Sequence, residues 1–120
     1  MSRRSDTARL LKISKYISDI EIIISRHSSA EASLADMEGQ YALMLCIAQI
    51  GELLNKIVTP EWSNRLPVKY AVAFRNIVVH DYEGININFA IKTLKESIPA
   101  LKTIILDLIK EYEITLPDKN

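Results

Sequence analysis

Apolar residues recur at intervals of three and four through most of this chain, a spacing that places them on one face of an α-helix. The first such stripe follows Asp6 and comprises Leu10, Ile13, Ile17, Ile20 and Ile24. It predicts an amphipathic helix that ends near residues 26–29. No alternating strand pattern lies between hairpin turns, and residues 85–89 are too few to build a sheet alone. The sequence therefore predicts an all-α fold.

The second predicted helix is apolar on most of its faces. It should run from about Ser33 or Asp36 to Val58, buried centrally or on two sides. Gly51 lies inside it, where glycine costs about 1 kcal/mol relative to alanine. A close helix crossing, within the fold or between subunits, would explain that cost. Cys46 lies in the same apolar run and is predicted to be a buried, unreactive thiol.

Proline and asparagine residues mark the later helices. Pro67 suits the first turn of a third helix that extends to about Val79. Asn86 or Asn88 can cap a fourth helix, and Pro99 either kinks that helix or opens a further one. No linker, repeat or low-complexity tract divides the chain. We therefore predict a single domain over residues 1–120, built as an up-and-down bundle of four to five helices.

Composition and charge limit the class of protein. The chain has 120 residues, 48% of them hydrophobic, and its single cysteine excludes an internal disulfide. A formal net charge of zero argues against a protein that holds nucleic acid mainly through a strong overall field. The more basic first 30 residues form either an RNA contact or an ordinary surface helix. His27 is predicted to be exposed near a helix end, where positive charge suits the helix dipole.

Targeting and membrane signals are not found in the sequence. The apolar residues after the basic N-terminus are interrupted by charged ones, so they do not form the core of a signal peptide. No stretch approaches the roughly 20 apolar residues of a membrane span. We therefore expect a cytoplasmic protein with no membrane partner.

The segment from Arg75 to Tyr82 carries the residues that best suit a reactive site. Arginine stays protonated and can hold a phosphate with a fork of donors, while histidine exchanges a proton near neutral pH. Helical residues turn by about 100° each, so Asn76 and His80 lie within about 40° of each other, whereas Arg75 and His80 are about 140° apart. Either the helix loosens before His80, or Arg75 pairs with the same segment of a second copy across a two-fold axis.

Such a site suits the cleavage of RNA without a metal. The 2′-hydroxyl of the substrate serves as nucleophile when a base such as His80 removes its proton and an acid protonates the leaving 5′-oxygen. Arg75 would neutralise the charge that develops on the phosphorane oxygens. Asn76 is either a group that orients the imidazole or the phosphate, or a solvated helix residue. Gly-rich phosphate loops and metal-binding motifs such as HExxH or paired CxxC are not found.

The motif Arg75-Asn76-(x3)-His80-x-Tyr82, in an all-α domain of this length, closely resembles that of the HepT-like toxins of the HEPN superfamily. The similarity extends to residues 50–52 on the second predicted helix, to the Pro67-led third helix and to residues 98–101. It covers nearly the whole chain. The motif alone is short, but the same motif in this helical setting is a strong signal.

The resemblance implies a HEPN-like fold and a metal-independent endoribonuclease toxin of a prokaryotic type II toxin–antitoxin pair, acting as a homodimer. It implies that Arg75 and His80 are the catalytic pair, that Asn76 is their polar neighbour, and that the protein needs no cofactor of its own. Tyr82 would be the residue that a cognate MNT-type nucleotidyltransferase antitoxin modifies with AMP from ATP. A bulky anion beside Arg75 and His80 would fill the cleft and repel an RNA phosphate.

Two other interpretations remain open. One is a non-catalytic helical module that presents substrate or partner to a nucleotidyltransferase, which the neutral net charge and the lack of a pronounced basic groove favour. The other is a degenerate relative that keeps the fold and has lost activity. The intact Arg75, His80 and Tyr82 argue against the second of these.

Overall fold

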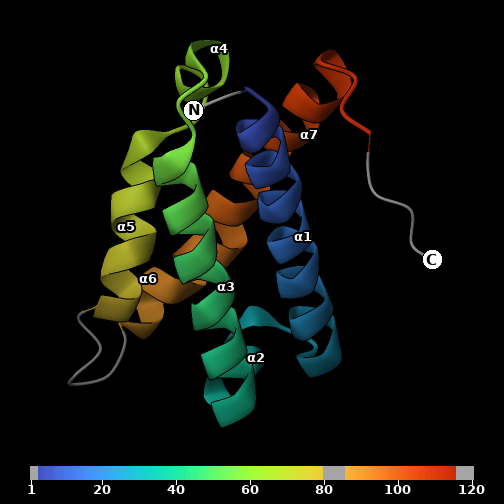
Figure 1. Cartoon of the computed structure of the whole chain (residues 1–120). Coiled ribbons are helices and arrows are strands. Elements are labelled where there is room, and N and C mark those ends of the chain that lie inside the picture. Colours follow the sequence, from blue (N-terminus) through green and yellow to red (C-terminus); the bar gives the residue numbers. More distant parts are fainter. Residues whose placement is uncertain (1–2, 80–85, 116–120) are drawn as a thin grey trace.

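The computed structural model describes residues 3–79 and 86–115, and all its regular elements in those ranges are helical (Figure 1). The four long helices are α1 (Arg3–His27), α3 (Met37–Lys56), α5 (Val68–Val79) and α7 (Ile98–Glu111). The short ones are α2 (Ala30–Ala35), α4 (Pro60–Ser63), α6 (Ile87–Lys92) and a π-helical turn, η1 (Thr93–Ser97). In Figure 1 the long helices run alternately down and up. The predicted all-α, up-and-down bundle is therefore confirmed.

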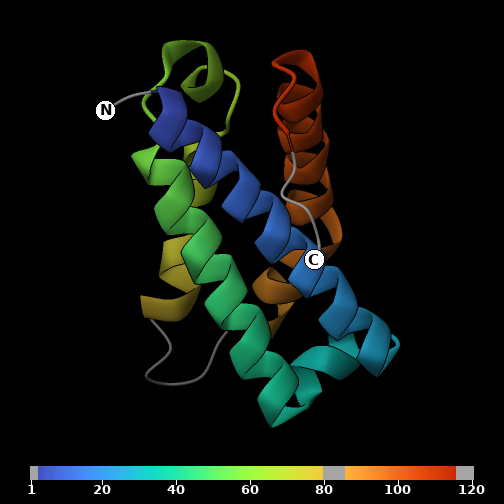
Figure 2. The same ribbon diagram turned by 45° about the vertical axis from the view of Figure 1, so that its right-hand side comes forward.

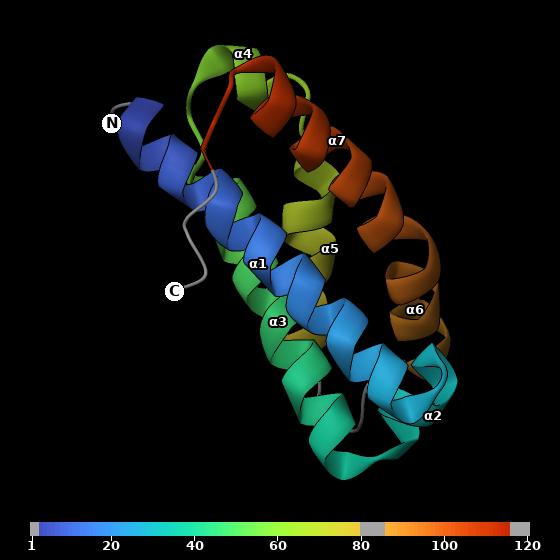
Figure 3. The same ribbon diagram turned by 90° about the vertical axis from the view of Figure 1, so that its right-hand side faces the viewer.

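Helix α3 lies between α1 and α5, and both pairs pack along their lengths (Figures 1 and 2). Helix α7 packs against α1 (Figure 3). The largest fully buried side chains are Trp62, Phe74, Leu10, Ile13, Ile17, Ile20, Leu43, Ile47, Ile50, Leu101, Ile105 and Leu108. All four apolar residues from Leu10 to Ile20 that define the first predicted stripe are in this set, so the spacing identified the buried face of α1 correctly.

Of the two predicted starts of the second helix, Ser33 and Asp36, the structure shows the one at Asp36. Asp36 has extended backbone angles and its Oδ2 accepts a hydrogen bond from the backbone N–H of Gly39 at 2.8 Å, which makes it the N-cap of α3. The preceding residues form the separate helix α2, whose N-cap Ser29 accepts from the N–H of Ala32 at 3.0 Å. The predicted end at Val58 is two residues late, because the chain turns extended at Ile57. Buried Cys46 is as predicted, and burial raises the pKa of its thiol.

His27 is half-buried, and the prediction of an exposed side chain is wrong. It is the last residue of α1, and its Nδ1 donates a hydrogen bond to the carbonyl of Ile23 at 2.8 Å. Its Nε2 lies 3.2 Å from Oδ2 of Asp36. The bond to Ile23, followed by the contact with Asp36, raises the pKa of His27. The imidazole therefore ties the end of α1 to the cap of α3, a contact that helix spacing alone does not reveal.

The segment after residue 85 combines capping with a change of helix type. Asn86 rather than Asn88 is the N-cap of α6, since its Oδ1 accepts from the N–H of Phe89 at 3.1 Å. The π-helical turn η1 then joins α6 to α7, and Pro99 lies in the first turn of α7. The backbone is helical at every residue from Ile87 to Glu111, so the α-helical segment α7 begins next to Pro99 without a break in the chain of helical residues. Within residues 3–79 and 86–115, no helix combines the length and apolar composition that a bilayer crossing requires.

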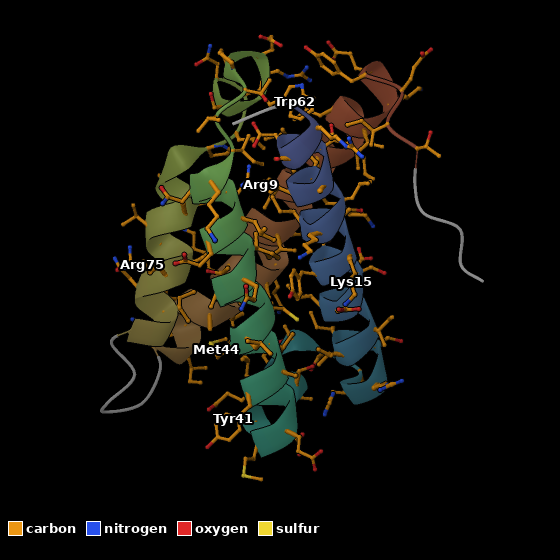
Figure 4. All side chains as sticks on the ribbon, viewed as in Figure 1. Arg9, Lys15, Tyr41, Met44, Trp62 and Arg75 are labelled. Atoms are coloured by element: carbon orange, nitrogen blue, oxygen red, sulfur yellow. The ribbon has the colours of Figure 1, made fainter. Side chains whose placement is uncertain are left out.

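A buried carboxylate holds the end of the bundle where α1 begins and α3 ends. The side chain of Asp6 is fully buried, and its Oδ2 accepts from the N–H of Val58 at 3.0 Å, the N–H of Thr59 at 2.7 Å and the hydroxyl of Thr59 at 2.6 Å. Its Oδ1 accepts from Arg9 at 2.7 Å. Burial by itself would raise the pKa of Asp6, but the bonds from Thr59, Arg9 and Val58 outweigh it and lower that pKa. Arg9 and nearby Trp62 mark this end in Figure 4.

Replacing Asp6 should destabilise the fold because it leaves buried donors without an acceptor. We expect Asp6→Ala to lower the free energy of unfolding by about 2–5 kcal/mol, measured by urea denaturation at pH 7. The control is Asp19→Ala on the same helix, which removes only an exposed pair with Lys15 and should have little effect. Because the pKa of Asp6 is lowered in the folded state, its contribution is complete above about pH 4 and is lost as the pH falls further. Equal stability of the two variants would contradict this role.

Candidate functional site

Arg75 and Asn76 are both exposed on α5, close to its C-terminal end. The opposite side of α5 is held in the core by Ala71, Phe74 and Ile77. Figure 4 shows Arg75 on the outer flank of α5, away from α1. The two side chains are about 100° apart around the helix. Arg75 borders α3, because it lines a depression with Gly51, Glu52 and Asn55, whereas Asn76 does not line that depression. The structure therefore keeps both predicted residues accessible but does not bring them to one face.

Gly51 of α3 sets the position of the turn of α5 that carries Arg75. A Cβ atom added at Gly51 would lie 3.2 Å from the carbonyl oxygen of Ala71, 3.2 Å from Cβ of Phe74 and 3.6 Å from the backbone N of Arg75. The backbones of the two helices are thus in direct contact, which requires a residue without a side chain. Of the two crossings that the sequence allowed, the structure shows the one within the fold.

A shallow depression of about 40 Å³ lies over this crossing, lined by Gly51, Glu52, Asn55, Ala71, Val72 and Arg75. It is too small to enclose a nucleotide, so a ligand here would rest on the surface of α3 and α5. In residues 3–79 and 86–115, no hydrogen bond or ion pair engages the guanidinium of Arg75, whereas Arg9 is paired with Asp6 and Arg65 with Glu111. Its donors are therefore available to an anion such as a phosphate.

His80 and Tyr82 lie outside the described residues, as do Asp81 and Gly84. The structure therefore tests neither the catalytic role predicted for His80 nor the modification predicted for Tyr82. It does show that α5 remains an α-helix through Val79, the residue before His80. The described part of α5 therefore shows no loosening of the helix between Arg75 and Val79. Among the described residues, no group of three His, Cys, Asp or Glu side chains is placed as metal ligands would be.

The sequence did not identify one accessible surface next to this site. Met37, Tyr41 and Leu45 on α3 are 65%, 65% and 59% exposed, although they belong to the helix predicted to be mostly buried. They are four residues apart, so they form one stripe, which we call the α3 stripe. The helix is indeed buried on two sides, by α1 and α5, and the α3 stripe is its third side. The regular spacing of large apolar residues on a third face was the available signal.

The fold and the site together define a small helical-bundle protein with a free arginine at the end of an exposed helix. Comparison with known families gives this class a name: residues 13–108 match the family described as ribonuclease HepT-like. The chain belongs to this family, and that membership makes it a member of a ribonuclease class with a HEPN-type fold.

Two curated proteins of Methanocaldococcus jannaschii are similar to this chain along almost all of its length. One is named "Putative RNase MJ1216" and is 29% identical over 115 residues, which cover 94% of each chain. The other is named "Putative RNase MJ0125" and is also 29% identical over 115 residues, covering 94% of this chain and 98% of its own. No solved structure gave a significant match.

Enlarging Gly51 should separate α3 from α5. We expect Gly51→Leu to lower the free energy of unfolding by about 1–3 kcal/mol, because the added atoms meet the backbone of α5 rather than a side chain that can move. Urea denaturation measures the loss. Glu52→Leu makes the same side chain one residue further on, at an exposed position, and should leave stability nearly unchanged. A Gly51→Leu variant as stable as the parent would show that the two backbones do not meet here.

Proposed function

We propose that the protein is a metal-independent endoribonuclease toxin of a type II toxin–antitoxin pair. The observation that carries the proposal is the exposed guanidinium of Arg75, which has no partner among residues 3–79 and 86–115 and lies at the surface of α5 in a chain of the ribonuclease HepT-like family. The names of the two similar archaeal proteins also support an RNase. The active residues we propose are Arg75 and His80, with Asn76 as their polar neighbour.

The reaction uses the substrate's own 2′-hydroxyl. His80 removes the proton from this hydroxyl, the 2′-oxygen forms a bond to the adjacent phosphorus, and the bond from phosphorus to the 5′-oxygen breaks. The protonated His80 then returns this proton to the leaving 5′-oxygen, so the products are a 2′,3′-cyclic phosphate and a 5′-hydroxyl. Arg75 donates to the phosphorane oxygens, where charge accumulates in the transition state. No cofactor takes part in these steps.

The active site belongs to a homodimer in this proposal. A regular helix places Arg75 and His80 about 140° apart, and α5 is regular through Val79, so a second copy supplies the missing partner more easily than local unwinding does. The α3 stripe supports this arrangement, because large exposed apolar residues on one face favour contact with another surface. Glu52 and Asn55 continue the same side of α3 to the depression beside Arg75.

Control of the toxin is proposed to act through Tyr82. A cognate MNT-type nucleotidyltransferase antitoxin would transfer AMP from ATP to the phenolic oxygen of Tyr82, with release of pyrophosphate. The new phosphodiester lies two residues from His80 in the sequence. Its negative charge would compete with the RNA phosphate for Arg75, and its bulk would occupy the cleft.

The alternative function is a non-catalytic helical module that presents substrate or partner to a nucleotidyltransferase. The formal net charge of zero favours it, since RNA-binding proteins usually carry an excess of positive charge. In that case Arg75→Ala would weaken binding to the nucleotidyltransferase, and neither protein would cleave RNA. The free guanidinium of Arg75 suits both functions, so nuclease activity is the measurement that separates them.

Mixing two inactive variants tests the composite site. We expect Arg75→Ala and His80→Ala each to abolish cleavage of RNA in the presence of EDTA. Refolded together in equal amounts, they should regain about a quarter of the parental activity, because half of the dimers are mixed and each mixed dimer has one intact site. The control is Arg65→Ala, which removes an arginine ion-paired with Glu111 and should remain active. Full activity of either single variant would refute the catalytic assignment, and no recovery on mixing would refute the shared site.

The modification of Tyr82 has its own measurement. Incubation with ATP, Mg²⁺ and the product of a neighbouring nucleotidyltransferase gene should add the mass of one or more AMP groups, all mapping to Tyr82, and cleavage of RNA should stop. Tyr82→Phe should gain no mass and should stay active in the same mixture. Tyr41→Phe is the matched control and should be modified normally, because Tyr41 lies on the α3 stripe. Modification at another residue, with Tyr82 unchanged, would overturn the proposed control.

A further inference from the structure

A second groove lies on the flank of α5 that faces away from α3. Its volume is about 480 Å³, twelve times that of the depression beside Arg75, and it is lined by α5, α6, η1 and the start of α7. A space of this size accommodates a nucleotide-sized ligand. We call it the α5–η1 groove. Lys69 of this groove lies within about 20° of Asn76 around α5 and about 10 Å from it along the helix axis, so the edge of the groove at Lys69 is on the Asn76 side of the helix.

Two aromatic residues supply flat surfaces in the α5–η1 groove. Tyr70 is half-buried and stacks on Phe74, with ring centroids 5.4 Å apart and an angle of 12° between the planes. Phe89 on α6 is 39% exposed. Its N–H donates to Asn86 at 3.1 Å and its carbonyl accepts from the hydroxyl of Thr93 at 2.9 Å, so the backbone beneath the exposed ring is fixed. Rigid, partly exposed rings are what an unpaired base needs for stacking.

The groove also carries positive charge that the protein leaves unpaired. Lys69 and Lys92 line it, and within residues 3–79 and 86–115 neither has an acidic partner. Nearby Lys95 and Lys102, by contrast, are paired with Glu31 and Glu21. The ammonium of Lys69 lies 5.9 Å from the ring centroid of Tyr70, so it stays beside the aromatic surface of the groove. An RNA phosphate would therefore meet two ammonium groups without first breaking an ion pair to a described carboxylate.

The π-helical turn η1 brings further polar groups to the same place. In η1 the N–H of Ile98 bonds the carbonyl of Thr93, five residues earlier, so the turn holds one residue more than an α-helical turn. Glu96 and Ser97 of this turn line the groove. The carboxylate of Glu96 can accept a hydrogen bond from a 2′-hydroxyl, a group that RNA has and DNA lacks. Such turns are rare and occur often at functional sites.

From these features we infer that the α5–η1 groove binds one unpaired nucleotide of an RNA strand, with its base against Phe89 and Tyr70 and its phosphate between Lys69 and Lys92. The inference rests on the proposed function, because it places the strand on the side of α5 next to Asn76. It extends that function by assigning a subsite for single-stranded RNA away from the bond that is cut. Duplex RNA does not fit this subsite, since its bases are already stacked and paired.

Fluorescence anisotropy with a labelled single-stranded oligouridine tests the inference, with every variant made in the His80→Ala background so that the RNA stays intact. The double variant Lys69→Gln/Lys92→Gln should bind at least about fivefold more weakly, and the slope of log K against log salt should become shallower by about 1.4. The matched control is Lys95→Gln/Lys110→Gln, which removes the same charge outside the groove and should bind within about twofold of the parent. Phe89→Leu keeps an apolar side chain and should also bind at least about fivefold more weakly.

Equal affinities for the two double lysine variants would overturn the inference. Failure of the His80→Ala protein to bind single-stranded RNA would also overturn the inference. The same holds if the groove variants bind RNA normally and lose only their affinity for the nucleotidyltransferase partner. Failure of the proposed function is distinguishable, because it appears as a parent protein that never cleaves RNA while the groove variants still weaken RNA binding. Circular dichroism of each variant establishes that the helical fold is retained.

Discussion

The contact between the backbones of α3 and α5 at Gly51 is the constraint on which the rest of the structure depends. A Cβ at this position would lie 3.2 Å from the carbonyl oxygen of Ala71 and from Cβ of Phe74, so glycine lets α5 approach α3 more closely than a larger residue would. The crossing buries one side of α5 and leaves Arg75 and Asn76 exposed on the others. Gly51 therefore lowers the intrinsic stability of α3, but it allows the close helix contact that positions the exposed surface of α5 with Arg75 and Asn76.

Much of the fold follows from the sequence, because the spacing of apolar residues is a direct consequence of helix geometry. The stripe from Leu10 to Ile20 and a helix cap at Asn86 or Asn88 were predicted from local rules, and the structure has the cap at Asn86. Features that depend on long-range contacts were not. Asp6 accepts hydrogen bonds from Val58 and Thr59, which lie more than 50 residues later in the sequence. His27 contacts Asp36 only once α1 and α3 have come together. No periodicity encodes either of them.

The candidate site divides in the same way. Arg75 and Asn76 were identified from the motif and are accessible, as a site requires, and helix geometry already implied that they point in directions about 100° apart. The exposed α3 stripe and the α5–η1 groove went unpredicted, because each depends on which faces of a helix its neighbours cover. The groove also draws lysines and aromatics from two helices and a π-helical turn far apart in sequence. Motif analysis finds residues that are close along the chain, and it misses surfaces assembled from several elements.

The neutral net charge of the chain bears on both proposed functions. It counts against RNA binding only if binding depends on the field of the whole molecule, which decays within about 10 Å at physiological salt.

The arrangement of charges is what matters at contact distance. The structure pairs Lys15, Lys95, Lys102, Arg9 and Arg65 with acidic residues. Among residues 3–79 and 86–115, it gives Arg75, Lys69 and Lys92 of α5 and α6 no acidic partner. A neutral protein arranged in this way would attract RNA weakly from a distance and hold its phosphates by direct contacts at the surface of α5 and α6, so binding would depend on local geometry. An AMP group added at that surface would then remove a large share of the binding energy with a small change in total charge.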